Sequence, residues 1–322
     1  MDLSIVIPLF NEEESIPELI DWIERVLSEQ SLQYEIILID DGSRDRSWDI
    51  IKELSGKKQS IKGISFQRNY GKAAALHTGF QAASGEVVIT MDADLQDSPE
   101  EIPELYRMIR VEGYDLVSGW KKKRYDPFFS KNLPSKFYNW TVRRMTHIKL
   151  HDMNCGLKAY RKKVTKSIEV YGDMHRFIPV LAKWAGFKKI GEKVVQHQER
   201  KYGVTKFGME RFIRGPLDLL SVMFISRFGK RPMHLFGVLG SLMFLLGFLA
   251  SLWVGIEKIY AVKHGINLRL VTDNPYFYIA LASMIIGTQL FLAGFLADLV
   301  SRNSAERNQY PIAERTNVTL NQ

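Results

Sequence analysis

Two carboxylates stand one residue apart directly after an apolar run. Residues 85–91 are rich in β-branched and apolar side chains and predict a buried strand, and Asp92, Asp94 and Gln96 follow it. In an open parallel sheet, ligands bind at the carboxyl ends of the strands. Carboxylate and amide oxygens are hard ligands that suit Mg²⁺ or Mn²⁺. The sequence predicts a divalent metal site that also holds a diphosphate, although an isolated pair of this kind is common in ordinary turns.

Similar polar groups follow three other apolar runs. Runs of strand length occupy residues 3–8, 34–39, 61–66, 86–91 and 115–119, and helical patterns separate them. This alternation predicts an α/β domain with a mostly parallel sheet and helices on both faces. The polar exits hold Pro8 to Glu13, then Asp40 and Asp41, then Asn69, Gly71 and Lys72, and then Asp92 to Gln96. We expect these four exits to converge on one edge of the sheet.

Two long apolar stretches follow this mixed part of the chain. Residues 235–256 carry no charge, and residues 276–300 carry only Asp298 near their end. Each stretch is long enough to cross a hydrocarbon core of about 30 Å, which predicts a two-helix transmembrane hairpin. The alternative, two buried core helices, needs a soluble domain large enough to hide both. The first residues lack the pattern of a signal peptide, and Cys155 is the single cysteine. Both features favour a cytoplasmic N-terminal domain in a multi-pass membrane protein.

The expected organisation has four parts. Residues 1–210 form the α/β domain, and residues 211–232 form an interfacial amphipathic segment, for which a core helix is the alternative. Residues 233–302 form the hairpin, and residues 303–322 form a cytoplasmic tail. The net charge of +8 next to a membrane favours anionic headgroups and phosphorylated substrates over nucleic acid. Glycines in both spans supply small residues for helix packing, and we expect a homo-oligomer, for which a tetramer is one candidate.

The four exits together resemble a known family. The segments that carry the resemblance are Ile5 to Glu13, Asp40 to Ser43, Arg68 to Lys72, and Asp92 to Gln96. They resemble the ordered motifs of inverting glycosyltransferases of family 2 with the GT-A fold. The similarity is strongest to the polyprenyl-phosphate branch, which includes bactoprenol glucosyltransferases and dolichol-phosphate mannose synthase. The two apolar stretches match the bacterial membrane-anchored members of that branch.

The resemblance implies roles for individual residues. Around the nucleotide the implied contacts are Pro8, Phe10 and Glu12, with Asp40 or Asp41 near the base and Lys72 on the donor. Asp92 would lie by the ribose and the metal, and Asp94 and Gln96 would contact the metal and the diphosphate. Arg200 and Lys206 would contact the diphosphate from a mobile loop. For that loop, a solvated basic segment is the alternative. Lys131 and Ser135 would contact the acceptor phosphate, although the family often has Arg where this chain has Lys131. Asp152 is the candidate base beside the catalytic Asp94.

The resemblance also implies a reaction. A sugar, with glucose the first choice, would pass from a UDP-sugar to undecaprenyl or another polyprenyl phosphate at the cytoplasmic face, with Mg²⁺ or Mn²⁺. Alternatives are the same reaction with modified arabinose, an N-acetylhexosamine or mannose from GDP-mannose, a processive polysaccharide synthase, and a non-enzymatic lipid-binding or flippase subunit. A phosphate monoester has a second pKa of about 6, so the acceptor is largely anionic at neutral pH. We therefore expect loss of the metal site to cost more activity than loss of Asp152.

Overall fold

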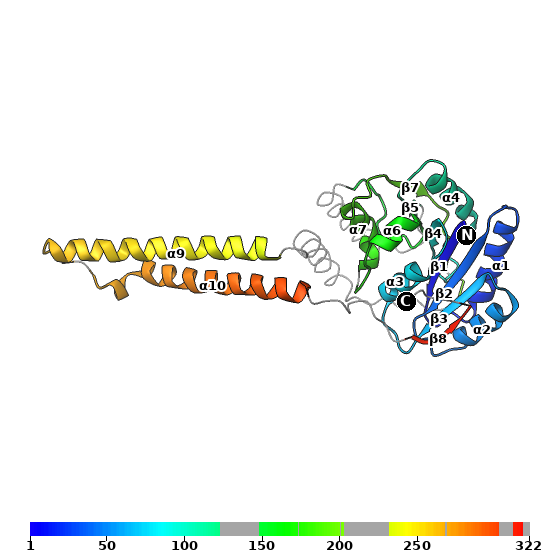
Figure 1. Ribbon diagram of the computed structural model, residues 1–322, viewed down its shortest axis with the longest axis horizontal. Coiled ribbons are helices and arrows are strands. Elements are labelled where there is room, and N and C mark those ends of the chain that lie inside the picture. The colour runs from blue at the N-terminus through cyan, green and yellow to red at the C-terminus, as the bar shows by residue number, and fades with distance from the viewer. Residues whose placement is uncertain are drawn as a thin grey trace. The chain divides into compact units, whose positions relative to one another are not determined.

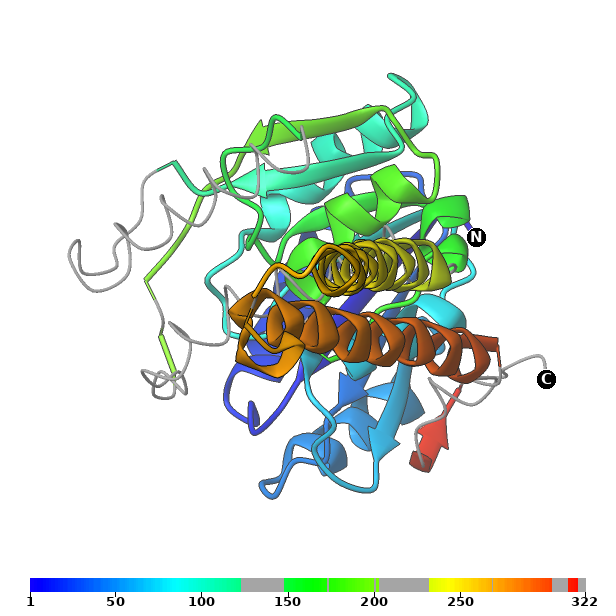
Figure 2. The same ribbon diagram turned by 90° about the vertical axis from the view of Figure 1, so that its left-hand side faces the viewer.

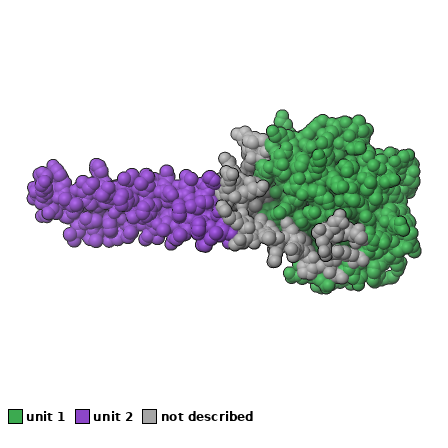
Figure 3. Space-filling view, in the orientation of Figure 1, with its two compact units in different colours: residues 1–220, 308–322 green, residues 221–307 purple. Residues whose placement is uncertain are grey.

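The chain divides into two compact units. The computed structural model describes residues 1–122, 148–172, 174–199, 201–202, 232–267, 269–302 and 312–317. Unit 1 comprises Met1–Leu220 and Asn308–Gln322, and unit 2 comprises Ser221–Arg307 (Figure 3). The C-terminal end of the chain thus returns to the first unit after the second has been completed.

Within the described residues, one sheet of eight strands forms the centre of unit 1 (Figure 1). Its spatial order is β7-β5-β6-β4-β1-β2-β3-β8. The strands are β1 (Leu3–Leu9), β2 (Tyr34–Asp40), β3 (Ile61–Phe66), β4 (Val87–Thr90), β5 (Leu116–Trp120), β6 (Lys158–Arg161), β7 (Ile190–Val194) and β8 (Ile312–Thr316). Strands β1 to β4 pair in parallel, as do β5 and β7, whereas β6 and β8 run antiparallel to their neighbours. The predicted mostly parallel sheet is confirmed, and the five predicted strands lie within two residues of β1 to β5.

Helices cover both faces of this sheet. They are α1 (Ser15–Ser28), α2 (Ser47–Lys57), α3 (Lys72–Ala82), α4 (Ile102–Arg110), α6 (Lys162–Ser167) and α7 (Ile178–Trp184), with short 3₁₀ turns η1 (Pro99–Glu101) and η3 (Met174–Phe177). The stripe Ile16, Ile20 and Ile23 of α1 has helical spacing and packs in one core with Ile5 and Ile7 of β1. On the opposite face α3 approaches β1 closely, because a Cβ at Gly79 would lie 2.3 Å from Val6 Cγ1.

The C-terminal strand closes one edge of the sheet. Strand β8 pairs antiparallel with β3 (red arrow in Figure 1). Trp48 Nε1 donates a hydrogen bond to Glu314 (2.6 Å), and the hydroxyls of Ser55 and Thr316 lie 2.8 Å apart. The tail expected at residues 303–322 therefore contributes a strand to the central sheet of unit 1. One short strand of mixed polarity has no repeated burial pattern, so the sequence did not indicate it.

Unit 2 contains two long antiparallel helices. They are α9 (Pro232–Lys263) and α10 (Pro275–Arg302), with the 3₁₀ turn η4 (Val271–Asp273) between them, and Figure 2 shows the pair end-on. Both are long and apolar enough to span a membrane. Large apolar side chains such as Leu245 and Phe295 are about half exposed. Within the described residues, that exposure favours the predicted membrane hairpin over two buried core helices.

Glycines bring the two hairpin helices into close contact. A Cβ at Gly240 would lie 2.6 Å from the carbonyl oxygen of Gly287, and a Cβ at Gly247 would lie 2.6 Å from that of Ala280. These small residues are therefore used within one chain. They give no support to self-association, and the homo-oligomer stays a prediction. The expected amphipathic segment 211–232 lies outside the described residues except for its last position.

Candidate functional site

The turn after β4 presents the predicted metal ligands on one side. Asp92, Asp94 and Gln96 are partly exposed, whereas Ala93 and Leu95 between them are buried. Leu95 adopts a left-handed conformation (φ 60°), and the backbone N–H of Gln96 donates a hydrogen bond to Asp94 Oδ1 (3.2 Å). Among the described residues, no three His, Cys, Asp or Glu side chains cluster as metal ligands. A metal here would depend on these two carboxylates and on oxygens from a ligand.

Asp92 lies in a strongly cationic environment. Its Oδ1 forms an ion pair with Lys72 Nζ, and Lys72 is the first residue of α3, directly after Gly71 (φ 93°). Burial alone would raise the pKa of the Asp92 carboxyl. The charges of Lys72, Lys121 and Lys158 outweigh burial and lower that pKa to about 2. Asp92 is therefore ionised at neutral pH.

Lys121 and Lys158 reach this site from distant positions in the chain. Lys121 directly follows β5, and its Nζ lies 2.7 Å from Asp97 Oδ1. Burial would lower the pKa of the Lys121 ammonium, but Asp97, Cys155 and Asp92 together outweigh burial and raise it. Lys158 in β6 is 3% exposed and donates a hydrogen bond to the Cys155 carbonyl, and burial lowers the pKa of its ammonium. The sequence did not indicate that either lysine lies near Asp92. Strand β6 inserts antiparallel between β4 and β5, and this long-range pairing leaves no pattern in the spacing of residues.

A glycine makes room for the Asp92 carboxylate. A Cβ at Gly156 would lie 2.6 Å from Asp92 Oδ2, closer than any side chain allows. Thr90 Oγ1 donates a hydrogen bond to the Gly156 carbonyl (2.9 Å), which ties this backbone to β4. The segment that contains the candidate base therefore passes directly against the predicted metal ligand.

The exits of β1 and β2 are joined by hydrogen bonds between two loops. The backbone N–H of Asn11 donates to Ser43 Oγ (2.8 Å), and the backbone N–H of Glu12 donates to Ser47 Oγ (2.9 Å). Pro8 is buried within β1, and Phe10 is partly exposed at its exit. A cavity of about 170 Å³ opens here, and Asn11, Glu12, Glu13, Glu14, Asp45 and Tyr202 line it. This part of the edge carries negative charge.

Asp40 and Asp41 are buried and bind neighbouring backbone. Asp40 accepts hydrogen bonds from the Ser43 amide (3.0 Å) and from Ser65 Oγ (2.9 Å). Asp41 accepts from the amides of Tyr70 (2.7 Å) and Gly71 (2.9 Å). Burial raises the pKa of Asp41 to about 6, although the two amides oppose this. These contacts fix the loop that begins α3, and the contact of either carboxylate with a base stays a prediction.

Asp152, the candidate base, is 1% exposed. Its backbone N–H donates to Glu192 Oε1 (3.0 Å), and its Oδ1 accepts a hydrogen bond from the backbone N–H of Asn154 (3.1 Å). The neighbouring His151 ring stacks on Trp120 with centroids 4.1 Å apart. The role of Asp152 as a base stays a prediction.

Four predicted contacts lie outside the described residues. They are Lys131 and Ser135 on the acceptor side, and Arg200 and Lys206 in the predicted mobile loop. Next to Arg200, Lys201 Nζ lies 2.7 Å from Glu18 Oε2 of α1, and Tyr202 Oη donates to the same oxygen (3.1 Å). This part of the chain is thereby attached to α1.

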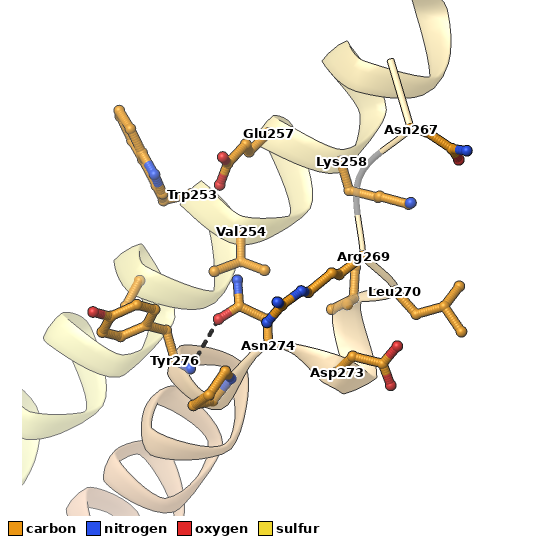
Figure 4. A pocket seen from close by; sticks show the side chains of 13 residues that line it. Trp253, Val254, Glu257, Lys258, Asn267, Arg269, Leu270, Asp273, Asn274 and Tyr276 are labelled. Carbon is orange, nitrogen blue, oxygen red and sulfur yellow. Dashed lines mark hydrogen bonds between the residues drawn. The ribbon is translucent and has the colours of Figure 1, made fainter. Parts of the chain in front are cut away.

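A larger cavity of about 850 Å³ lies in unit 2, at the loop between α9 and α10 (Figure 4). Its lining includes Trp253, Glu257, Arg269 and Tyr276, and Asn274 Oδ1 accepts the Tyr276 amide (3.0 Å). None of its lining residues, which all fall within the described part of the hairpin, belongs to the predicted site. We therefore assign the site to the sheet edge of unit 1.

Known proteins resemble this chain over most of its length. Residues 4–169 match the model of the family described as glycosyl transferase family 2. The chain is 36% identical over 304 residues to a dodecaprenyl-phosphate galacturonate synthase of Rhizobium johnstonii, covering 94% of this chain and 88% of that protein. It is also 36% identical over 303 residues to an undecaprenyl-phosphate 4-deoxy-4-formamido-L-arabinose transferase of Pectobacterium carotovorum, with the same coverage of 94% and 88%.

A solved structure shares the fold. Glucosyl-3-phosphoglycerate synthase from Mycobacterium tuberculosis, in complex with Mn²⁺, UDP and phosphoglyceric acid, superposes with a TM-score of 0.53. The match covers 70% of this chain and 78% of that chain, at 19% identity. The similarity shows that unit 1 has the GT-A fold, as the sequence predicted.

Proposed function

The chain belongs to glycosyl transferase family 2, and from this we propose that it transfers a sugar from a nucleoside diphosphate to a polyprenyl phosphate, with inversion at the anomeric carbon. It is a glycosyltransferase with a GT-A domain and a candidate membrane hairpin. The observation that carries the proposal is the match over 94% of the chain, hairpin included, to proteins whose names specify polyprenyl-phosphate acceptors.

The cationic group at the exit of β4 supports a diphosphate donor. Lys72, Lys121 and Lys158 act electrostatically on Asp92. The ammonium of Lys72, which pairs with Asp92, suits the negative charge that develops on a departing nucleoside diphosphate. The acidic cavity at the exits of β1 and β2 disfavours phosphate and suits the neutral nucleoside part. A donor bound along the edge would therefore have its base towards β1 and β2 and its diphosphate towards β4.

The residues at the exit of β4 fit a divalent metal. Asp92 and Asp94 offer carboxylate oxygens and Gln96 an amide oxygen on the same side of the turn, and Asp92 is ionised. We propose that Asp94 and Gln96, with Asp92, hold Mg²⁺ or Mn²⁺ together with the diphosphate. When bound, the metal supplies positive charge against the leaving group. Lys72, which pairs with Asp92, would then lie beside the bound metal.

The acceptor needs little help from a base. A phosphate monoester has a second pKa of about 6, so its oxygen is mostly unprotonated at neutral pH. Attack opposite to the leaving diphosphate inverts the anomeric carbon in one displacement. Asp152 would orient the acceptor or take a residual proton. The hairpin would keep the domain close to a phosphate that lies at the depth of the lipid headgroups, with the domain on the cytoplasmic side.

The sugar itself is proposed only as a set. The sequence alone favoured glucose from UDP-glucose, whereas the named relatives transfer galacturonate and a formamido arabinose. We therefore propose a UDP-sugar donor from the set galacturonate, modified arabinose and glucose. These sugars differ in a carboxylate or a formamide, which a buried hydrogen-bonding site can distinguish strongly.

The test is transfer of labelled sugar into an organic-soluble product. Purified full-length protein is incubated with undecaprenyl phosphate, Mg²⁺ or Mn²⁺, and a panel of UDP- and GDP-sugars. We expect label in the lipid phase from one UDP-sugar, its loss with EDTA, and its recovery when metal is restored. Transfer that persists with EDTA contradicts the metal proposal. No transfer from any donor by folded protein contradicts the reaction and favours a non-enzymatic lipid-binding role.

A further inference from the structure

Asp97 is a buried carboxylate that the proposed reaction does not use. It follows the predicted metal ligands in the turn after β4, and its side chain is 0% exposed. A carboxylate removed from water is costly unless charges or hydrogen bonds compensate it. Its partners therefore indicate why this position holds an acid.

The two oxygens of Asp97 contact different parts of the site. Oδ1 lies 2.7 Å from Lys121 Nζ, at the exit of β5. Oδ2 faces the backbone amide of Asp92 at 3.5 Å, at the exit of β4. One buried side chain thus joins the exits of two strands that are not neighbours, because β6 lies between them in the sheet.

The backbone of the same turn contacts a third segment. Asp97 forms an isolated antiparallel bridge with His197, and the Gln198 amide donates to the Gln96 carbonyl (3.0 Å). Residues 196–198 follow β7, and they precede the basic stretch that begins at Arg200. The turn that carries the predicted metal ligands is therefore attached to β5 and to the chain after β7.

The exit of β5 belongs to the acceptor side of the proposed site. Ser118 Oγ of β5 donates to the Asp152 carbonyl (3.3 Å), and the Gly119 amide donates to the Leu157 carbonyl (2.9 Å). The candidate base thus packs against β5, while the predicted metal ligands lie on the turn after β4. The ion pair between Asp97 and Lys121 bridges these two halves.

We propose that Asp97 is a positioning residue that, through Lys121, holds the acceptor side of the site in line with the donor turn. This rests on the proposed transfer reaction. With the pair broken, donor and metal still bind, but the acceptor phosphate and the anomeric carbon no longer meet at the reactive distance and angle. A displacement of about 1 Å can lower a rate by 10²-fold. Water, which needs no such alignment, then competes better for the donor.

The test compares transfer with hydrolysis of the donor. Asp97→Asn, Asp97→Glu, Lys121→Met and the double variant are measured in full-length protein. The control is Asp115→Asn at the opposite end of β5, where Asp115 accepts the Lys189 amide (3.0 Å) and pairs with Arg161 (3.8 Å). Readouts are kcat and KM for polyprenyl phosphate, the ratio of hydrolysis to transfer, the affinity for UDP with Mn²⁺, and Tm.

We expect Asp97→Asn to lower transfer on the order of 10- to 100-fold and to raise the hydrolysis ratio. UDP affinity should stay within about threefold, Asp97→Glu should recover part of the transfer, and the double variant should be no worse than the poorer single variant. The control should alter Tm without changing the ratio.

Four results would overturn the inference. An unchanged hydrolysis ratio in Asp97→Asn, or a loss of UDP affinity as large as the loss of transfer, leaves Asp97 a structural or donor-side role. Additive effects in the double variant contradict action through Lys121. Wild-type protein without transfer activity contradicts the proposed function itself, and the role of Asp97 with it.

Discussion

The two ends of the candidate site differ in the charged side chains that surround them. At the exit of β4, Lys72, Lys121 and Lys158 act electrostatically on Asp92, whereas acidic side chains line the cavity at the exits of β1 and β2. Both ends are exits of parallel strands in one mixed sheet, so the fold alone does not distinguish them. The difference indicates that lysines delivered after β3, after β5 and from β6 set the charge around an edge that β1 to β4 provide.

The sharpest test of this contrast replaces one acid at each end. We expect Asp94→Asn to lower transfer on the order of 10³-fold, because it removes a charge that the leaving diphosphate and its metal need. Asp45→Asn in the acidic cavity should lower it far less. Steady-state transfer of both variants measures the difference. Equal losses would mean that charge at the β4 exit has no special role.

Substitution of Asp152 distinguishes the contribution of a base from that of the metal site. We expect Asp152→Asn to lower kcat by at most about 10²-fold, a value typical of general bases, because the acceptor is already anionic. A kcat lower than that of Asp94→Asn would reverse our ranking. The pH profile of kcat adds a second check, since loss of a true base removes its acidic limb.

Gly156 tests the close approach of the acceptor segment to Asp92. An added Cβ must displace the Asp92 carboxylate, so Gly156→Ala should destabilise the fold by about 1–3 kcal/mol and weaken Mn²⁺ binding in the presence of UDP. Gly56→Ala on α2 is the matched control, because no atom lies within 4 Å of its added Cβ. Thermal unfolding and Mn²⁺ titration give the two readouts. Unaltered Mn²⁺ binding would show that Asp92 tolerates displacement.

The smallest expected effect concerns Asp41 and the pH dependence of stability. Its pKa of about 6 in the fold exceeds the ordinary value of 3.8, so its protonated form is favoured by folding. This stability is fully present below about pH 4 and is lost as pH rises through about 6, with roughly 3 kcal/mol as an upper value. Asp41→Asn should remove this slope. The difference between the two Tm curves from pH 4 to 7 isolates it from other carboxylates, and parallel curves would contradict the raised pKa.

Much of this edge followed from the sequence. Strands β1, β2 and β4 are buried on both faces and appear as nearly continuous apolar runs followed by polar residues. In β3, Lys62, Gly63 and Ser65 interrupt the apolar residues, so its pattern is weaker. That local signal located Asp92, Asp94 and Gln96 on one turn and Lys72 beside them. Convergence then needed only the rule that parallel strands end together.

The rest depended on pairings that leave no local trace. Lys158 reaches Asp92 because β6 inserts antiparallel between β4 and β5, and Asp97 meets Lys121 across that insertion. The closing strand β8 has five residues and pairs with a strand about 250 positions earlier. Long-range pairing of short polar segments is decided by tertiary contacts rather than by their own patterns.

The return of the chain to β3 has a practical consequence for any soluble version of this enzyme. The hairpin is inserted within the catalytic sheet in sequence, since residues on both sides of it belong to unit 1. A protein truncated before α9 would lack β8 and expose the unpaired edge of β3, which is a template for aggregation. Removing only the hairpin and joining its flanks with a short flexible linker would keep that edge covered.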